Sequence, residues 1–121
     1  MKTCLVVDDS RVVRKVCSKI LTELGFQISE AGDGKEALNF CNATKPDLIL
    51  LDWNMPVMNG LEFLKAFRQL DGNKKTKVVL CTTENDAEKI QTAISSGADE
   101  YVMKPFDNAI IKGKLEQIGL L

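Results

Sequence analysis

Short apolar runs without polar alternation are the feature that most constrains the fold of this chain. Four of them cover residues 5–7, 48–51, 78–81 and 101–103. Runs of this length indicate strands that are buried on both faces, as in a parallel sheet. Residues 26–31 fit a fifth short strand. The sequence therefore predicts a sheet that helices must cover on both sides.

Apolar residues at helical spacing predict a helix after each strand. The first helix follows Ser10, a good N-cap, and stops at Gly25. The others are expected over residues 35–43, over residues 61–70, between Asn85 and Gly97, and from Asp107 to Ile118. Alternating strands and helices imply an α/β fold, a doubly wound five-stranded parallel sheet with five helices. The strand order 2-1-3-4-5 is expected by analogy with flavodoxin-like proteins.

Two of these helices carry specific core predictions. On the fourth helix, Ile90, Ala93 and Ile94 are expected to share one face. On the last helix, the residues expected to face inward are Ile110, Ile111, Leu115 and Ile118. Such stripes are typical of helices that pack against a sheet.

Reactive side chains follow four of the predicted strands directly. Asp8 and Asp9 follow the first, Asp52 the third, Thr82 the fourth and Lys104 the fifth. In open parallel sheets, ligands bind outside the carboxyl ends of the strands. We therefore expect these side chains to converge on one edge of the sheet and to form a site there.

The three aspartates of this edge predict a metal site. Converging carboxylates repel each other unless a cation lies between them, and hard oxygen ligands favour Mg²⁺ or Mn²⁺ over zinc. The expected direct ligands are Asp9, Asp52 and the backbone carbonyl of Asn54, with Asp8 acting through water. Alternatively, Asp8 and Asp9 cap the first helix together with Ser10, which leaves Asp52 unexplained.

Asp52 is the candidate nucleophile, because a carboxylate can attack phosphorus to form an acyl phosphate. Thr82 would donate its hydroxyl to one phosphoryl oxygen, and Lys104 would pair with another as a mobile charge. Lys104 has the alternative of a solvated surface lysine. Its position at a strand end, before Pro105, argues against that alternative.

Composition narrows the class of protein. The 121 residues fit one domain, and a net charge of -1 favours neither nucleic acid nor an anionic membrane as partner. We see no signal peptide and no apolar stretch near the roughly 20 residues of a membrane span, so we expect a cytoplasmic protein. The chain has no histidine, and its cysteines are expected to be buried free thiols, at Cys4, Cys17, Cys41 and Cys81.

The order of these motifs resembles the receiver domain of two-component response regulators. The resemblance rests on Asp8-Asp9, the segment from Asp52 to Gly60, Thr82, and Lys104 with its following Pro105-Phe106, and it spans essentially the whole chain. It implies Mg²⁺-dependent phosphorylation of Asp52 by the phosphohistidine of a sensor histidine kinase. It also implies one receiver domain over residues 1–121 with no output domain, a signalling protein and not an enzyme.

Within that family the chain is most similar to stand-alone CheY-like chemotaxis regulators, through Glu84, Tyr101 and Lys114 as well as the segment after Asp52. The resemblance implies that Asn54 and Glu84 tune dephosphorylation and that the acyl phosphate lasts seconds to minutes.

The resemblance also implies a switch. Thr82 would move toward the phosphate, and Tyr101 would turn inward after it. Without the family, Tyr101 is a half-buried aromatic at the sheet edge. Two positions depart from the family pattern: Asn59, with little expected effect, and Thr83, which would crowd the path of Thr82.

The output is expected to be a protein contact, the flagellar motor switch in chemotaxis. The expected partner face holds Ile90, Ala93, Ile94, Tyr101 and Lys114. A phosphate sink or relay intermediate is the alternative, and the protein is expected to be monomeric.

Two other readings fit less well. A phosphatase of the haloacid dehalogenase type needs an acid where Asn54 stands. A flavin or nucleotide binder needs a glycine-rich phosphate loop after the first strand, which the sequence lacks.

Overall fold

The computed structural model describes residues 2–70, 75–83, 87–104 and 106–121. Strands and helices alternate, in the order β1 Thr3–Val7, α1 Arg11–Glu23, β2 Gln27–Ala31, α2 Gly34–Ala43, β3 Leu48–Asp52, α3 Gly60–Gln69, β4 Lys77–Thr82, α4 Ala87–Ser95, β5 Glu100–Met103 and α5 Asn108–Gln117. The sequence predicted all ten, with small errors at the boundaries. Asn85, the expected cap of the fourth helix, lies outside the described residues.

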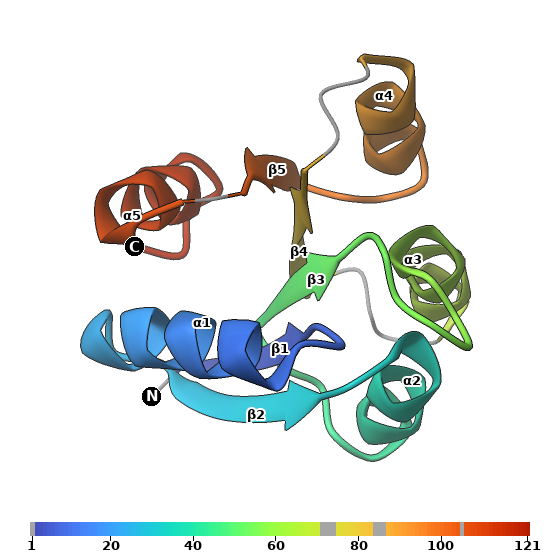
Figure 1. Cartoon of the computed structure of the whole chain (residues 1–121), viewed down its shortest axis with the longest axis horizontal. Coiled ribbons are helices and arrows are strands. Elements are labelled where there is room, and N and C mark those ends of the chain that lie inside the picture. The colour runs from blue at the N-terminus through green and yellow to red at the C-terminus, as the bar shows by residue number, and fades with distance from the viewer. Residues whose placement is uncertain (1, 71–74, 84–86, 105) are drawn as a thin grey trace.

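The strands form one parallel sheet in the order β2-β1-β3-β4-β5 (Figure 1), which confirms the expected flavodoxin-like topology. The order reverses between β1 and β3, which are neighbours although β2 separates them in the chain. In this class of fold the reversal point is where ligands bind.

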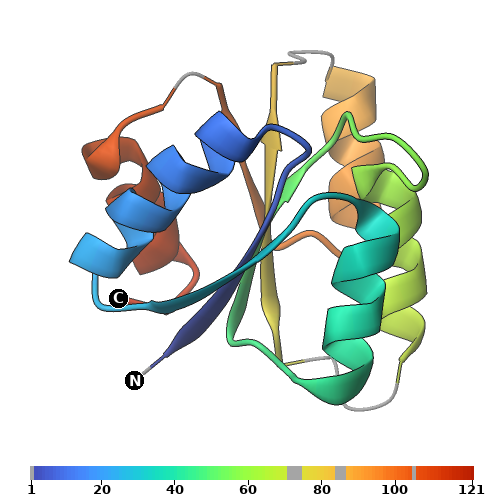
Figure 2. The ribbon, with the colours of Figure 1, turned by 60° about the horizontal axis from the view of Figure 1, so that its bottom comes forward.

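Helices cover both faces of the sheet, as Figure 2 shows: α1 and α5 on one face, and α2, α3 and α4 on the other. Successive strand residues point to opposite faces, so each strand contributes to two cores. The core under α1 and α5 includes Val6, Leu50 and Val79, whereas Val7 and Leu51 belong to the core under the other three helices. Both faces of the sheet are therefore apolar, which explains why polar and apolar residues do not alternate along the strands.

Some helical residues that the sequence placed inward are exposed. On α5, Ile110 is 45% exposed while Ile111 and Leu115 are buried. On α4, Ala93 is buried and Ile94 is 38% exposed, so the two do not share one environment and Ala93 is not on a partner face. Each helix presents only a narrow stripe to the sheet, and apolar residues beside that stripe remain in solvent.

Capping residues fix where the helices begin. Ser10 accepts a hydrogen bond from the backbone N–H of Val13 at 3.3 Å, and Asp107 plays the same part for α5. Asn59 forms a capping box with Glu62 at the start of α3. An asparagine caps a helix as well as an aspartate does, so this departure from the family pattern preserves the helix start.

The four cysteines are buried free thiols, as expected. Burial raises the pKa of Cys17 and of Cys41 to about 11, which keeps both protonated. In the part of the chain that the structure describes, no helix is both long enough and apolar enough to span a bilayer.

Gly60 brings the start of α3 against the end of β3. Its backbone N–H donates to the carbonyl of Trp53 at 2.9 Å, and a Cβ at this position would overlap the backbone oxygen of Asp52. Only a glycine therefore allows the helix to lie this close to the Asp52 backbone.

We expect Gly60→Ala to destabilise the protein by about 1–3 kcal/mol, because the methyl group has no space. Gly113 provides the matched control, since a Cβ there meets nothing within 4 Å inside α5. Gly113→Ala should stabilise the protein by about 0.5–1 kcal/mol. Urea unfolding of both variants measures the two effects, and equal stabilities would contradict the assigned role of Gly60.

Candidate functional site

Strand register brings the predicted side chains to one edge of the sheet. Val7 pairs with Leu51, so Asp8 and Asp52 come next on adjacent strands at the reversal point. Asp52 is the last residue of β3 and Thr82 the last of β4. These groups lie together because the carboxyl ends of the parallel strands meet at one edge of the sheet, as the sequence suggested.

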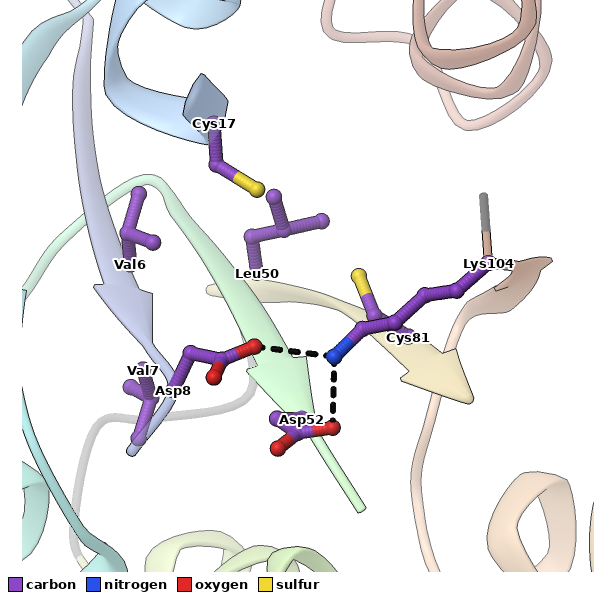
Figure 3. A pocket seen from close by; sticks show the side chains of 8 residues that line it. All are labelled: Val6, Val7, Asp8, Cys17, Leu50, Asp52, Cys81 and Lys104. Atoms are coloured by element: carbon purple, nitrogen blue, oxygen red, sulfur yellow. Dashed lines mark hydrogen bonds and ion pairs between the residues drawn. The ribbon is translucent and has the colours of Figure 1, made fainter. Parts of the chain in front are cut away.

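Lys104 bridges the two buried aspartates. Its Nζ lies 2.9 Å from Oδ2 of Asp8 and 2.9 Å from Oδ1 of Asp52 (Figure 3). The side chain reaches from the end of β5 over β4 to the middle of the sheet. Lys104 is therefore not a solvated surface lysine, and that alternative is wrong.

Asp9 completes an acidic cluster, which we define as Asp8, Asp9 and Asp52. Ligand oxygens of the three carboxylates lie within 4.8 Å of one another. Asp8 and Asp52 are 4% and 6% exposed, whereas Asp9 faces solvent. Such a cluster is typical of the Mg²⁺ site of receiver domains. Helix capping alone does not account for it, because Asp52 belongs to a different strand.

The acidic cluster carries more negative charge than Lys104 neutralises, which favours the binding of a further cation. Burial is the largest influence on the pKa of Asp52 and raises it. The hydrogen bond and charge of Lys104 lower this pKa, whereas repulsion from Asp8 and Asp9 raises it. The net result is a raised pKa. Burial alone would lower the pKa of Lys104, but its bonds to Asp8 and Asp52 outweigh burial and raise it. Three carboxylates thus face one firmly protonated ammonium.

The other predicted residues differ in how far they are exposed to solvent. Thr82 is buried, and Asn54 is exposed in the loop after β3. Tyr101 is half-buried on β5, and the Nζ of Lys114 lies 5.0 Å from the centre of its ring. Glu84 lies outside the described residues.

The expected partner face is partly exposed. Ile94 is 38% exposed and Ile90 is half-buried, both on α4. Lys114 on α5 also pairs with Glu100 at 3.5 Å. These side chains belong to α4, β5 and α5, which lie at one end of the sheet (Figure 1).

Sequence reasoning missed two groups that hold Asp8. The backbone N–H of Ser10 donates to Oδ1 of Asp8 at 2.9 Å. Arg14, one turn into α1, donates from Nη1 to the backbone carbonyl of Asp8 at 2.7 Å. A basic residue on a surface helix carries no signal of such a contact, which only the path of the β1–α1 loop creates.

The chain belongs to the family of response regulator receiver domains, whose model matches residues 4–116. Proteins of this family accept phosphate from histidine kinases, and they are signalling proteins and not catalytic enzymes.

Several similar proteins are CheY chemotaxis proteins, so the chain is a CheY-like receiver. Chemotaxis protein CheY1 of Helicobacter pylori is 37% identical over 116 residues, which cover 94% of both proteins. The structure of CheY4 of Vibrio cholerae has a TM-score of 0.92 and 37% identity, with 98% of both chains covered. A CheX-CheY-BeF₃-Mg²⁺ complex of Borrelia burgdorferi matches with a TM-score of 0.91 and 28% identity, covering 97% of this chain and 88% of the other.

The raised pKa of Asp52 gives a stability test. A carboxyl whose pKa rises on folding destabilises the folded protein once it ionises, and this effect vanishes below its unfolded pKa of about 3.9. Without Mg²⁺ at pH 7, we expect Asp52→Asn to stabilise the protein by about 1 kcal/mol, or a few degrees in Tm. The difference should disappear near pH 3.

Thermal unfolding at both pH values measures this effect. Asp33→Asn is the matched control, because it removes the same charge from the partly exposed N-cap of α2 and leaves a good cap. A less stable Asp52→Asn at pH 7 would show that the Lys104 ion pair outweighs burial and repulsion.

Proposed function

We propose that this chain is a CheY-like regulator in which Asp52 accepts a phosphoryl group from the phosphohistidine of a sensor histidine kinase. The observation that carries the proposal is the acidic cluster with Lys104 at 2.9 Å from both Asp8 and Asp52. It combines a carboxylate nucleophile, an excess of negative charge and a mobile counter-charge at one edge of the sheet.

The cluster fits Mg²⁺, because all its side-chain donors are hard oxygens and their charge exceeds that of Lys104. Asp9, Asp52 and the carbonyl of Asn54 would hold the ion directly, and Asp8 through water. Bound Mg²⁺ would neutralise charge on the phosphoryl oxygens. The Mg²⁺ in the related Borrelia burgdorferi complex supports this assignment.

In the proposed reaction, a carboxylate oxygen of Asp52 forms a bond to phosphorus as the bond from phosphorus to the imidazole nitrogen breaks. The leaving nitrogen keeps the electron pair, and the product on Asp52 is an acyl phosphate. Lys104 exchanges its contact with the Asp52 oxygen for one with a phosphoryl oxygen. Thr82 donates a hydrogen bond from its hydroxyl to another phosphoryl oxygen. Asn54, which is exposed, and Glu84 set how readily water attacks the acyl phosphate.

The signal would leave through the face formed by α4, β5 and α5. Movement of Thr82 at the end of β4 opens space beside Tyr101, since Leu80 pairs with Tyr101 and Thr82 with Met103 across the two strands. Tyr101 then turns inward. The face that would meet a partner also includes Lys114, whose Nζ lies 5.0 Å from the centre of the Tyr101 ring, and Ile90 and Ile94 on α4.

Chemotaxis is the proposed setting, with the flagellar motor switch as the partner, because relatives at 36–37% identity are chemotaxis proteins. We further propose a monomeric, cytoplasmic protein with one receiver domain over residues 1–121. A phosphate sink or relay intermediate is the second candidate, since its chemistry at Asp52 is the same.

Phospho-acceptor activity has a direct optical test. Trp53 is the only tryptophan and follows Asp52 directly. We expect Mg²⁺ to change its fluorescence, and acetyl phosphate to cause a second change that requires Mg²⁺, because the new charge lies beside the indole. Asp52→Asn should lose the second response, and a mass increase of one phosphoryl group should appear only in the wild type. An unresponsive, unphosphorylated wild type would overturn the proposal.

The partner can be tested with a peptide from the flagellar motor switch. Beryllofluoride with Mg²⁺ should raise the affinity of the peptide by about tenfold, a typical coupling between two sites. The double variant Ile94→Ala and Lys114→Ala should lose this gain. Val12→Ala is the control, because Val12 is 73% exposed on α1, outside the face formed by α4, β5 and α5.

Titration calorimetry measures both affinities. No gain with beryllofluoride, in a protein that still becomes phosphorylated, would favour the phosphate sink.

A further inference from the structure

Arg14 connects three parts of the fold beside the acidic cluster. Its Nη1 donates to the backbone carbonyl of Asp8 at 2.7 Å, and its Nε donates to Oε1 of Glu30 on β2 at 3.0 Å. The Arg14 side chain is 18% exposed, so its hydrogen bonds are partly shielded from water. A fork of two donors on one rigid group thus ties α1 and β2 to the loop between β1 and α1.

These contacts fix the peptide that carries Asp9. The N–H of Asp8 donates to the carbonyl of Ala31 at 3.1 Å, and its carboxylate accepts from Ser10 at 2.9 Å and from Lys104. Arg14 holds the remaining polar group of Asp8, its carbonyl. That carbonyl belongs to the peptide bond between Asp8 and Asp9, so its orientation sets where the Asp9 side chain starts.

We propose that Arg14 is a positioning residue that orients the Asp8–Asp9 peptide for cation binding by Asp9. The proposal rests on the Mg²⁺ site described above. Asp9 differs from Asp8 and Asp52 in being exposed, so burial does little to hold it. The Arg14 hydrogen bond supplies that order through the backbone.

The charge of Arg14 and its role in orienting the peptide predict opposite changes in Mg²⁺ affinity when Arg14 is replaced. Arg14 is a cation near a cluster that attracts cations, so loss of its charge alone would tighten Mg²⁺ binding. Loss of orientation would weaken it, and outer contacts that orient metal ligands typically contribute 10–100-fold in affinity. The direction of the change therefore separates the two roles.

The experiment measures the Mg²⁺ dissociation constant by Trp53 fluorescence and, independently, by the rise of Tm with Mg²⁺ concentration. We expect Arg14→Met to weaken binding about tenfold. Lys15→Met is the matched control: it removes a positive charge from an exposed neighbour on α1 and should leave binding unchanged or slightly tighter.

Arg14→Lys keeps the charge but not the fork, so it should also weaken binding, and it serves as the test if the methionine variant is unfolded. Wild-type or tighter binding in Arg14→Met would overturn the proposal, as would full affinity in Arg14→Lys. A wild type that shows no Mg²⁺ response refutes the metal site itself, and the role of Arg14 with it. An Mg²⁺ response that all variants share refutes only the role of Arg14.

Discussion

The bridge from Lys104 to Asp8 and Asp52 is the interaction on which the site depends. Two buried carboxylates on adjacent strands repel each other, and the ammonium 2.9 Å from each makes their proximity tolerable. One ammonium does not balance three carboxylates, and burial together with repulsion from Asp8 and Asp9 raises the pKa of Asp52. A further cation would therefore stabilise the acidic cluster, and a bound group with an acceptor oxygen would offer Lys104 a new partner.

The sheet order makes this bridge possible. Because β4 lies between β3 and β5, Lys104 must cross the end of β4 to reach Asp52. The backbone N–H of Lys104 also donates to the carbonyl of Thr82 at 2.9 Å, which ties Lys104 to the end of β4. The same order puts Asp8 and Asp52 on neighbouring strands, whereas a sheet in chain order would separate them by β2.

Much of the fold and of the site was predictable from the sequence, and the failures have two physical origins. Strand positions and the convergence of strand-end side chains on one edge follow from apolar runs and from the geometry of parallel sheets. The strand order, which brings Asp8 beside Asp52, was expected only by analogy with flavodoxin-like proteins. Periodicity finds the apolar side of a helix, but it does not give the width of the stripe that the sheet covers. Ile110 and Ile94 were misjudged for that reason. Contacts of long side chains with loop backbone, such as that of Arg14, depend on the path of the loop and leave no pattern.

In the proposed switch, the neighbours of Lys104 also decide which face of the protein responds. Thr82 and Tyr101 lie on adjacent strands, and Lys114 stands over the Tyr101 ring while it pairs with Glu100. A short chain of contacts therefore runs from the end of β4 through β5 to α5. The groups around Asp8 are different, since backbone hydrogen bonds and Arg14 hold them in one arrangement. If Lys104 and Thr82 move on phosphorylation as proposed while the groups around Asp8 stay fixed, the change would be transmitted toward α4, β5 and α5.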